Sequence, residues 1–388
     1  MRNLYCKSSV SAGITSGYSV YRPESGTVEA QVMIRSGSRL NTLRSWLSIA
    51  DELHRIRQEL DFPENALLFL RVFCSDIINQ AKILRENFPA QFGLSMRQNI
   101  SIVQQPPLPD SKLAAWAYLV KGDTPVRQTE FGNHFYSNGL THYWTANLSG
   151  SESDPVALQT EQMFARYIRL LASHNLDLMK NAIRTWIFVR DVDSQYMDMA
   201  GTRKLVFKKE GLTDLTHYIA STGIEGRNEN PGHSVFMDAF SISGLKPEQV
   251  RYLQAGNHMC PTHHYGVTFE RGATIIYGDR KHIYLSGTAS ISNKGQILFP
   301  DDPGGQVSRI IENMEALLME AGAGLSDLTC LIVYLRDIAD YKLVRKKIMS
   351  ILPGLPAIFL QASICRPGWL VEAEGVAVCD ACTQWPKY

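Results

Sequence analysis

Two glutamates near the C-terminus are the first candidates for chemistry. Glu372 and Glu374 lie in the run WLVEAEGVAV (residues 369–378), whose apolar residues predict a β-strand. Side chains two residues apart on a strand point to the same face of a sheet. Burial beside Trp369 and Val371 would raise the pKa of Glu372 toward neutrality, as a general acid at neutral pH requires. The alternative is a glutamate that only pairs with an arginine on a sheet surface.

A cysteine and three arginines could complete a site around this acid. Cys365 precedes Glu372 by seven residues. We interpret its thiol as a wall or weak polar contact rather than a nucleophile, because the sequence shows no paired base nearby. Arg203, Arg271 and Arg366 are candidates for holding substrate carboxylates, since a guanidinium binds a carboxylate in a bidentate way. The alternative for each is an ordinary surface arginine.

Other clusters carry weaker signals. Cys379 and Cys382 form a CxxC pair, but no second pair lies at zinc-finger spacing, so no metal site is predicted. The run CPTHH (residues 260–264) is interpreted as a loop with solvated histidines, and whether His264 lines a cleft stays open. A glycine-rich phosphate loop and a GxSxG motif are both lacking. We therefore expect no cofactor.

An internal repeat indicates how these residues are positioned. The run WIFVRD (186–191) is followed by a tyrosine five residues later, and IVYLRD (332–337) by a tyrosine four residues later. Each run follows an amphipathic helical stretch and precedes a second helix and two extended segments. A fainter copy, with ALLFLRVFCSD, lies near the N-terminus. Each unit reads β, α, β, α, β, β.

The predicted fold class is α/β (α+β), with three degenerate units in one chain. The expected units are residues 1–125, 130–245 and 264–388, and each is a mixed sheet covered by two helices. Three similar units in one chain suggest an intramolecular pseudo-trimer that acts as a monomer.

The repeat also supplies an internal comparison for the candidate acid. Phe236 matches Glu372 in the middle unit, and Asp238 matches Glu374. The first unit has no acid between Lys112 and Val120. Because only the third unit has this acid, we expect one active site per chain.

Composition narrows the class of protein. The 388 residues carry 39 Lys and Arg against 38 Asp and Glu, and 45% are hydrophobic. Neither a basic excess nor a basic stripe is present, so nucleic acid is not an expected partner. The sequence shows no apolar run long enough for a signal peptide or a membrane span. Seven cysteines, an odd number, suit free thiols in a reducing compartment, and we expect a cytoplasmic protein.

Three motifs in order carry a family resemblance: YGVTFERG (265–272), SGTASI (286–291) and CRPGWLVEAE (365–374). Together they resemble the chorismatases, which share the RidA/YjgF ancestry. The resemblance covers about residues 180–380 well and the first 130 residues loosely. It implies a RidA/YjgF-like fold, with three units arranged around clefts.

The resemblance also implies an activity, which is removal of pyruvate from chorismate by protonation of its enol ether. Glu372 would be the acid. The substrate would contact Arg203, Tyr265, Arg271 and Arg366.

The identity of the product is a finer expectation. Cys365, together with Gly278 at 94 residues before Glu372, resembles the chorismatases that form 3-hydroxybenzoate. A 4-hydroxybenzoate or dihydroxy-cyclohexadiene acid product stays open. Two other functions stay open as well, a RidA-type enamine or imine deaminase and a non-catalytic small-ligand-binding protein. A ribonuclease is least favoured, because the charge is neutral and no paired catalytic histidines are evident.

Overall fold

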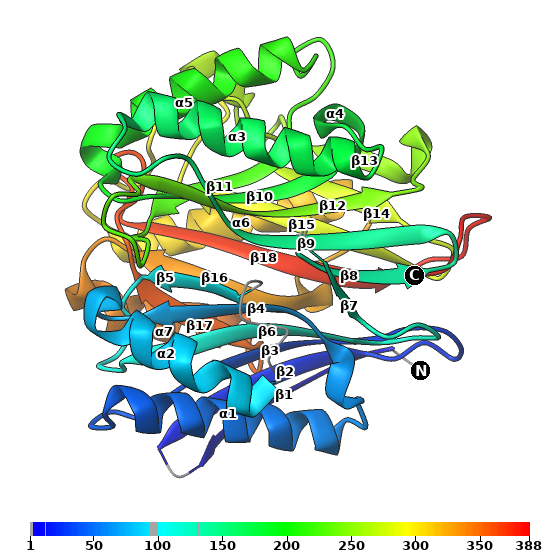
Figure 1. The fold of residues 1–388 in the computed structure, drawn as a ribbon. Coiled ribbons are helices and arrows are strands. Elements are labelled where there is room, and N and C mark those ends of the chain that lie inside the picture. Colours follow the sequence, from blue (N-terminus) through cyan, green and yellow to red (C-terminus); the bar gives the residue numbers. More distant parts are fainter. Residues whose placement is uncertain (1–2, 12, 93–99, 130–131) are drawn as a thin grey trace.

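Three mixed β-sheets, one from each unit, form the centre of the molecule. The computed structural model describes residues 3–11, 13–92, 100–129 and 132–388, and within these residues it contains three six-stranded sheets. Helices α3 and α5 lie on one side of the molecule and α1 and α2 on the opposite side, with strands between them (Figure 1). The predicted fold, three RidA/YjgF-like units in a pseudo-trimer, is confirmed.

The first unit has strand order β1-β2-β3-β6-β4-β5. Its elements are β1 (Leu4–Ser11), β2 (Ile14–Tyr21), β3 (Val28–Arg35), α1 (Thr42–Glu59), β4 (Leu67–Cys74), α2 (Ile77–Phe92), β5 (Ile100–Gln104) and β6 (Leu113–Lys121). The second unit has the order β11-β10-β12-β9-β8-β7. Its elements are β7 (Arg127–Thr129), β8 (Gly132–Ser137), β9 (Leu140–Ser149), α3 (Val156–Ser173), α4 (Leu178–Asn181), β10 (Ala182–Val189), α5 (Val192–Lys209), β11 (Ala220–Glu225) and β12 (Val235–Ser243).

The third unit has the order β13-β14-β15-β18-β16-β17. Its elements are β13 (Val250–Leu253), β14 (Gly272–Ile276), β15 (Arg280–Ala289), α6 (Pro303–Glu320), β16 (Leu328–Leu335), α7 (Tyr341–Ile351), β17 (Ala357–Gln361) and β18 (Val371–Asp380). In all three sheets the same connection recurs, with the strand after the first helix parallel to the strand after the second.

Each unit has two more strands than the sequence predicted. In each unit only one strand was expected before the first helix. Two further strands precede that helix, which are β1 and β2 in the first unit, β7 and β8 in the second, and β13 and β14 in the third. These strands lie at or next to a sheet edge, and several are short or polar, such as LYCKSSVS in β1. An edge strand of this kind lacks the long apolar pattern on which the prediction depended. The sheet of the third unit consequently begins at Val250, ahead of residue 264.

The sheets are buried on both faces. Helices α1 and α3 pack Trp46 and Phe164, respectively, against the outer faces of the first and second sheets. The inner faces meet in a shared core, where Trp186 of the second unit contacts Trp116 of the first at 5.6 Å between ring centroids. Double-sided burial explains why strands such as β4, β10 and β16 read as unbroken apolar runs.

A buried arginine–carboxylate pair lies at each junction between units. The pairs are Arg71–Asp238 at 2.7 Å between the first and second units, Arg184–Glu374 at 2.5 Å between the second and third, and Arg280–Glu29 at 2.6 Å between the third and first. All six side chains are almost fully buried. A buried pair contributes little net stability but leaves an uncompensated charge if one partner is lost, so each pair fixes how two units associate.

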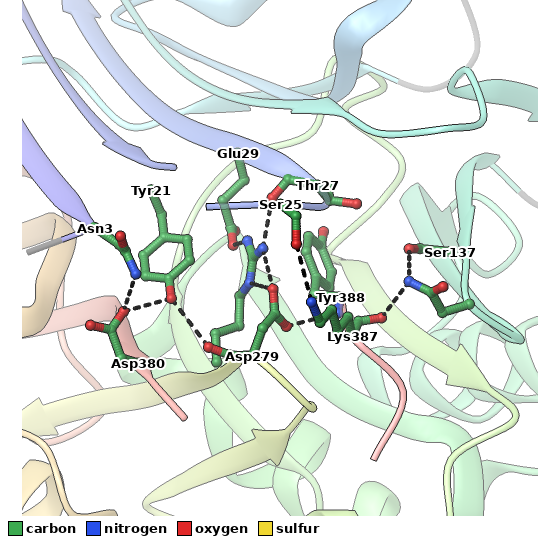
Figure 2. A network of polar contacts seen from close by, with 12 residues as sticks. Asn3, Tyr21, Ser25, Thr27, Glu29, Ser137, Asp279, Asp380, Lys387 and Tyr388 are labelled. Atoms are coloured by element: carbon green, nitrogen blue, oxygen red, sulfur yellow. Dashed lines mark hydrogen bonds and ion pairs between the residues drawn. The ribbon is translucent and has the colours of Figure 1, made fainter. Parts of the chain in front are cut away.

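The C-terminal residues close the junction between the third and first units (Figure 2). Arg280 donates to Glu29 and to the Thr27 carbonyl. The Tyr388 hydroxyl lies 2.6 Å from that of Tyr118. The Tyr388 backbone N–H donates to Asp279 at 3.0 Å. Asn138 of the second unit donates to the Lys387 carbonyl at 3.0 Å, so side chains from all three units hold the chain end. None of the helices in the described part of the chain is long and apolar enough to cross a membrane.

Candidate active site

A cleft between the second and third units brings the predicted acid together with two of the predicted arginines. Helix α5 and strand β11 form one wall, and β15, β18 and the segment before β18 form the other. The enclosed cavity measures about 30 Å³. Its lining comprises Tyr196, Arg203, Ser221, Thr222, Gly223, Val267, Phe269, Arg271, Gly287, Ala289, Ile291, Cys365, Trp369 and Glu372.

Glu372 is buried in this cleft without a polar partner. It lies on β18 between Ala289 of β15 and Tyr334 of β16, and its side chain is 4% exposed. No hydrogen bond or ion pair to its carboxylate is present among the described residues. Burial raises the pKa of Glu372 to about 8, and the charge of Glu374 adds to this effect, although Arg184 and Arg271 oppose it. Glu372 is therefore largely protonated at neutral pH and able to donate a proton.

Glu374 has the opposite environment, although it lies on the same face of β18. One carboxylate oxygen accepts from Arg184 at 2.5 Å and from the Thr222 hydroxyl, and the other accepts from the Tyr334 hydroxyl at 2.7 Å. Glu374 thus forms an ion pair with Arg184, and its negative charge adds to the effect of burial on the pKa of Glu372.

The comparison between repeats is confirmed by strand register. Glu372 and Glu374 oppose Tyr334 and Ile332 on β16. The corresponding pairs in the second unit are Phe236 with Phe188, and Asp238 with Trp186. In the first unit, Ala114 and Trp116 occupy the two positions, opposite Phe73 and Arg71. Among the three equivalent positions, only that of the third unit carries the cleft acid.

Because Gly287 has no side chain, the Glu372 carboxylate can lie against its backbone. A β-carbon at Gly287 would lie 2.2 Å from the Glu372 Oε1 atom, which is closer than any real contact. The Gly287 N–H donates to the Thr222 hydroxyl at 2.9 Å, and this hydroxyl also bonds to Glu374. Strand β15 is irregular here, with a register shift between Leu285 and Thr288. The bulge brings the Gly287 backbone close to the acid.

Two arginines flank the acid from different units. Arg203 on α5 is 1% exposed, and its Nε and Nη2 atoms have no hydrogen-bond partner. Arg271, just before β14, donates to the Cys260 carbonyl at 3.0 Å and lies over the ring of Phe269. A buried guanidinium with unused donors is suited to binding a carboxylate from a ligand.

Cys365 lines the same cavity as a neutral thiol. Burial raises its pKa to about 12, the negative charge of Glu372 acts in the same direction, and a hydrogen bond with Tyr196 opposes the shift. Since the thiolate is the nucleophilic form, this cysteine is poorly suited to covalent catalysis.

Gly278 lies outside the cleft, which corrects the sequence-based expectation. It precedes β15, whose opposite end carries Gly287 and Ala289 in the cleft. Its N–H donates to the Pro386 carbonyl at 2.8 Å, and a β-carbon at Gly278 would lie 2.3 Å from the Trp385 carbonyl oxygen. The glycine is needed for close approach of the C-terminal segment.

Arg366 and His264 are absent from the lining of the cleft. Arg366 donates to the Gly295 carbonyl at 3.2 Å and lies over the ring of Trp369, which does line the cavity. His264 is exposed. Tyr265 ends a short 3-10 helix (Thr262–Tyr265), and its side chain lies outside the described residues.

Sequence reasoning missed three residues that shape the cleft. Tyr196 was noted only as a repeated position, although its ring lies beside Gly223 and Cys365. Gly287 lies inside the SGTASI motif, so that motif was the available signal. Thr222 carried no signal, because its role depends on a contact between units. No group of three or more His, Cys, Asp or Glu side chains suited to a metal ion occurs among the described residues.

Comparisons with known proteins support the fold. Residues 274–379 match the family model for endoribonuclease L-PSP. The crystal structure of a chorismatase superposes with a TM-score of 0.62 at 16% sequence identity, covering 81% of this chain and 93% of that one. A putative endoribonuclease L-PSP from Entamoeba histolytica covers 33% of this chain and 98% of its own at 18% identity and a TM-score of 0.29. RidA from an Antarctic Psychrobacter covers 33% and 98% at 19% identity and a TM-score of 0.27. The chain therefore has the chorismatase fold, with an endoribonuclease L-PSP match in its third unit.

Proposed function

We propose that this protein removes pyruvate from chorismate, with Glu372 as the general acid. The observation that carries the proposal is a buried carboxyl without a polar partner, whose pKa of about 8 keeps it protonated at neutral pH. An enol ether needs a proton at its methylene carbon before water can attack. A positioned acid with a pKa near the working pH is suited to that step.

The proposed reaction balances with water as the second reactant. Glu372 gives its proton to the methylene carbon, which leaves an oxocarbenium-like centre next to the ether oxygen. Water adds to this centre and returns a proton to the Glu372 carboxylate. The resulting hemiketal collapses to pyruvate and a ring alcohol. The carboxylate of Glu374, which is paired with Arg184, adds negative charge beside the site and so favours the positive charge that develops during protonation.

The cleft also offers partners for the substrate's two carboxylates. Arg203 and Arg271 come from different units, and the two unused nitrogen atoms of Arg203 lie inside the protein. Arg366 is assigned an indirect role, because it contacts the ring of Trp369 rather than the cavity.

The described cavity must widen to admit a ring. About 30 Å³ holds little more than one water molecule, whereas a benzene ring fits a cavity of roughly 150 Å³. A neighbouring cavity of about 50 Å³ shares Phe269 and Arg271 with the cleft. We propose that movement of residues 254–271, which contain only one short 3-10 helix, joins the two cavities.

The product is a finer part of the proposal. Gly278 no longer contributes to it, so the 3-hydroxybenzoate assignment rests on Cys365, which lines the cavity. If its side chain keeps water from the oxocarbenium-like centre, the substrate's own ring hydroxyl displaces the ether oxygen from the neighbouring ring carbon. That carbon–oxygen bond breaks and pyruvate leaves, after which loss of a ring proton aromatises the ring, and no water is consumed. Cys365→Ala is then expected to retain pyruvate release and to raise the share of dihydroxy-cyclohexadiene acid. An unchanged product ratio would remove Cys365 from this role.

The decisive experiment is incubation of the purified protein with chorismate. Pyruvate is followed with lactate dehydrogenase, and the ring product by chromatography. Glu372→Gln is expected to lower turnover at least about a hundredfold, while Glu315→Gln, an exposed residue on α6, leaves it unchanged. In the unaltered protein, activity should fall above about pH 8 as Glu372 ionises. Absence of pyruvate would refute the proposal, and ammonia release from an enamine substrate would instead favour a deaminase.

We also propose that the protein acts as a monomer. All three junctions between units form within one chain, each with its own buried ion pair. We therefore expect a monomer in light scattering after size-exclusion chromatography.

A further inference from the structure

The junction between the third and first units contains a second cleft, equivalent by pseudo-symmetry to the catalytic one. Helix α7 and strand β17 take the places of α5 and β11, and β2 and β3 take those of β14 and β15. Tyr341 at the start of α7 corresponds to Tyr196 on α5. The cavity in this second cleft measures about 230 Å³, which is larger than the catalytic cavity.

The charge at the centre of the second cleft is reversed. In the catalytic cleft, neighbouring strands pair Ala289 with Glu372. The same register position between β3 and β6 pairs Arg35 with Ala114. The acid has become a methyl group, and an arginine stands where the catalytic unit has an alanine. A second cation, Arg345 of α7, also lines this cavity.

The two guanidinium groups retain binding capacity. Arg35 is partly buried and donates to the Thr15 hydroxyl at 3.0 Å and to the Pro109 carbonyl at 3.2 Å. Arg345 is exposed on α7, and the described residues provide it with no hydrogen bond. Neither arginine forms an ion pair within the described part of the chain. The carboxylate whose charge acts on Arg35 is that of Asp110, which is exposed and forms no ion pair with it.

The remainder of the cavity is mainly apolar and partly aromatic. Tyr341 and Phe359 meet edge to face, with ring centroids 5.7 Å apart and an interplanar angle of 83°. Met33, Leu355 and Ile358 complete this part of the lining. A cavity of roughly 150 Å³ holds a benzene ring, so 230 Å³ leaves room for a ring and a carboxylate. Aromatic and aliphatic walls with a few charged groups are typical of small-molecule sites.

We propose that the second cleft binds a small cyclic monocarboxylate, with its ring against Tyr341 and Phe359 and its carboxylate between Arg35 and Arg345. The site is distinct from the catalytic cleft, and the proposal does not depend on the chorismatase reaction. The two clefts occupy equivalent positions, but the acid Glu372 lines only the first of them among the described residues.

Calorimetric titration of the full-length protein with benzoate tests the proposal. We expect saturable binding that Arg345→Glu weakens at least about tenfold, because it replaces an attractive charge with a repulsive one. Lys346→Glu is the matched control, since Lys346 is also exposed on α7 but does not line the cavity. It should leave the affinity within about twofold. Arg35→Lys, which keeps the charge but loses the planar fork, should weaken binding by an intermediate factor.

Two further arms separate this cleft from the catalytic one and test the ligand class. Arg203→Met, in the catalytic cleft, should leave the benzoate site of the second cleft intact. Acetate lacks the ring and benzyl alcohol lacks the charge, so both should bind at least about tenfold more weakly than benzoate. Loss of benzoate binding in Arg203→Met but not in Arg345→Glu would overturn the proposal, as would equal effects of Arg345→Glu and Lys346→Glu. Absence of saturable binding to the unaltered protein would overturn it too.

Discussion

Glu372 and Glu374 lie two residues apart on one face of β18, yet only Glu374 has hydrogen-bond donors around its carboxylate. Arg184, Thr222 and Tyr334 all donate to Glu374. Glu372 faces the cavity, and burial raises its pKa to about 8. The two carboxyl groups therefore have different environments, because one is paired with Arg184 and the other is buried at the cavity.

This difference predicts opposite effects on stability. The pKa of Glu372 is raised on folding, so its ionisation opposes folding as pH rises from about 4.5 toward 8. Glu372→Gln should therefore stabilise the protein increasingly over that pH range, by at least about 1 kcal/mol at pH 8. Denaturant unfolding at pH 4.5 and pH 8 measures the change. Equal stability of variant and parent at pH 8 would contradict the raised pKa.

Glu374→Gln serves as the matched comparison and should destabilise the protein. It leaves Arg184 buried opposite a neutral amide, and the loss of one partner from a buried pair costs about 3 kcal/mol or more. The same denaturant measurement at pH 7 checks this value. A variant as stable as the parent would show that the pair does not hold the second and third units together.

Gly287→Ala should impair catalysis more than folding. The added methyl group would fall 2.2 Å from Glu372 Oε1, so the carboxyl must rotate away from its position in the cleft. We expect turnover with chorismate to fall at least about tenfold, because a misplaced acid transfers its proton poorly. Gly201→Ala is the control, since nothing lies within 4 Å of its added β-carbon on α5. It should preserve turnover and raise stability by about 0.5–1 kcal/mol.

Arg203 and Arg366 should differ in their effect on substrate binding. Arg203 lines the cavity with unused donors, so Arg203→Met is expected to raise KM for chorismate at least about tenfold. Arg366 does not line the cavity and lies over the ring of Trp369, so Arg366→Met should raise KM by about threefold or less. Steady-state kinetics on both variants gives the comparison. A larger effect at Arg366 would reverse the assignment.

The sequence predicted the parts of the site that depend on local pattern. Alternation along β18 placed Glu372 and Glu374 on one face, and the repeated RD strands established which positions of the three units correspond. Gly278 was wrongly placed in the cleft because the prediction used its sequence separation from Glu372, which does not determine where it lies in the fold. Gly278 lies in the bend before β15, and the strand from Arg280 to Gly287 alone spans roughly 23 Å. Contacts between units, such as Thr222 with Glu374, have no local signature and could not be predicted.

Glu29 should control stability in acid. Burial alone would raise its pKa, but His282 and Arg280 lower it to about 2. A carboxylate with a depressed pKa stabilises the folded state above its unfolded pKa of about 4.3, and this contribution is lost as pH falls toward 2. Glu29→Gln should therefore lower stability at pH 7 by about 1–3 kcal/mol, because Arg280 and His282 lose the carboxylate that they share, although Arg280 keeps its ion pair with Asp279.

The stability of Glu29→Gln should vary less than that of the parent between pH 4.5 and 2, because the variant lacks the carboxylate that titrates in this range. Glu24→Gln, an exposed residue on the loop before β3, is the control and should change neither quantity. Thermal unfolding of the three proteins across this range measures both effects. The Glu29 network contacts the C-terminal Tyr388 through Tyr118, so removal of Tyr388 should destabilise the same junction. If Glu29→Gln kept the parent's pH dependence, the junction between the third and first units would not titrate through Glu29.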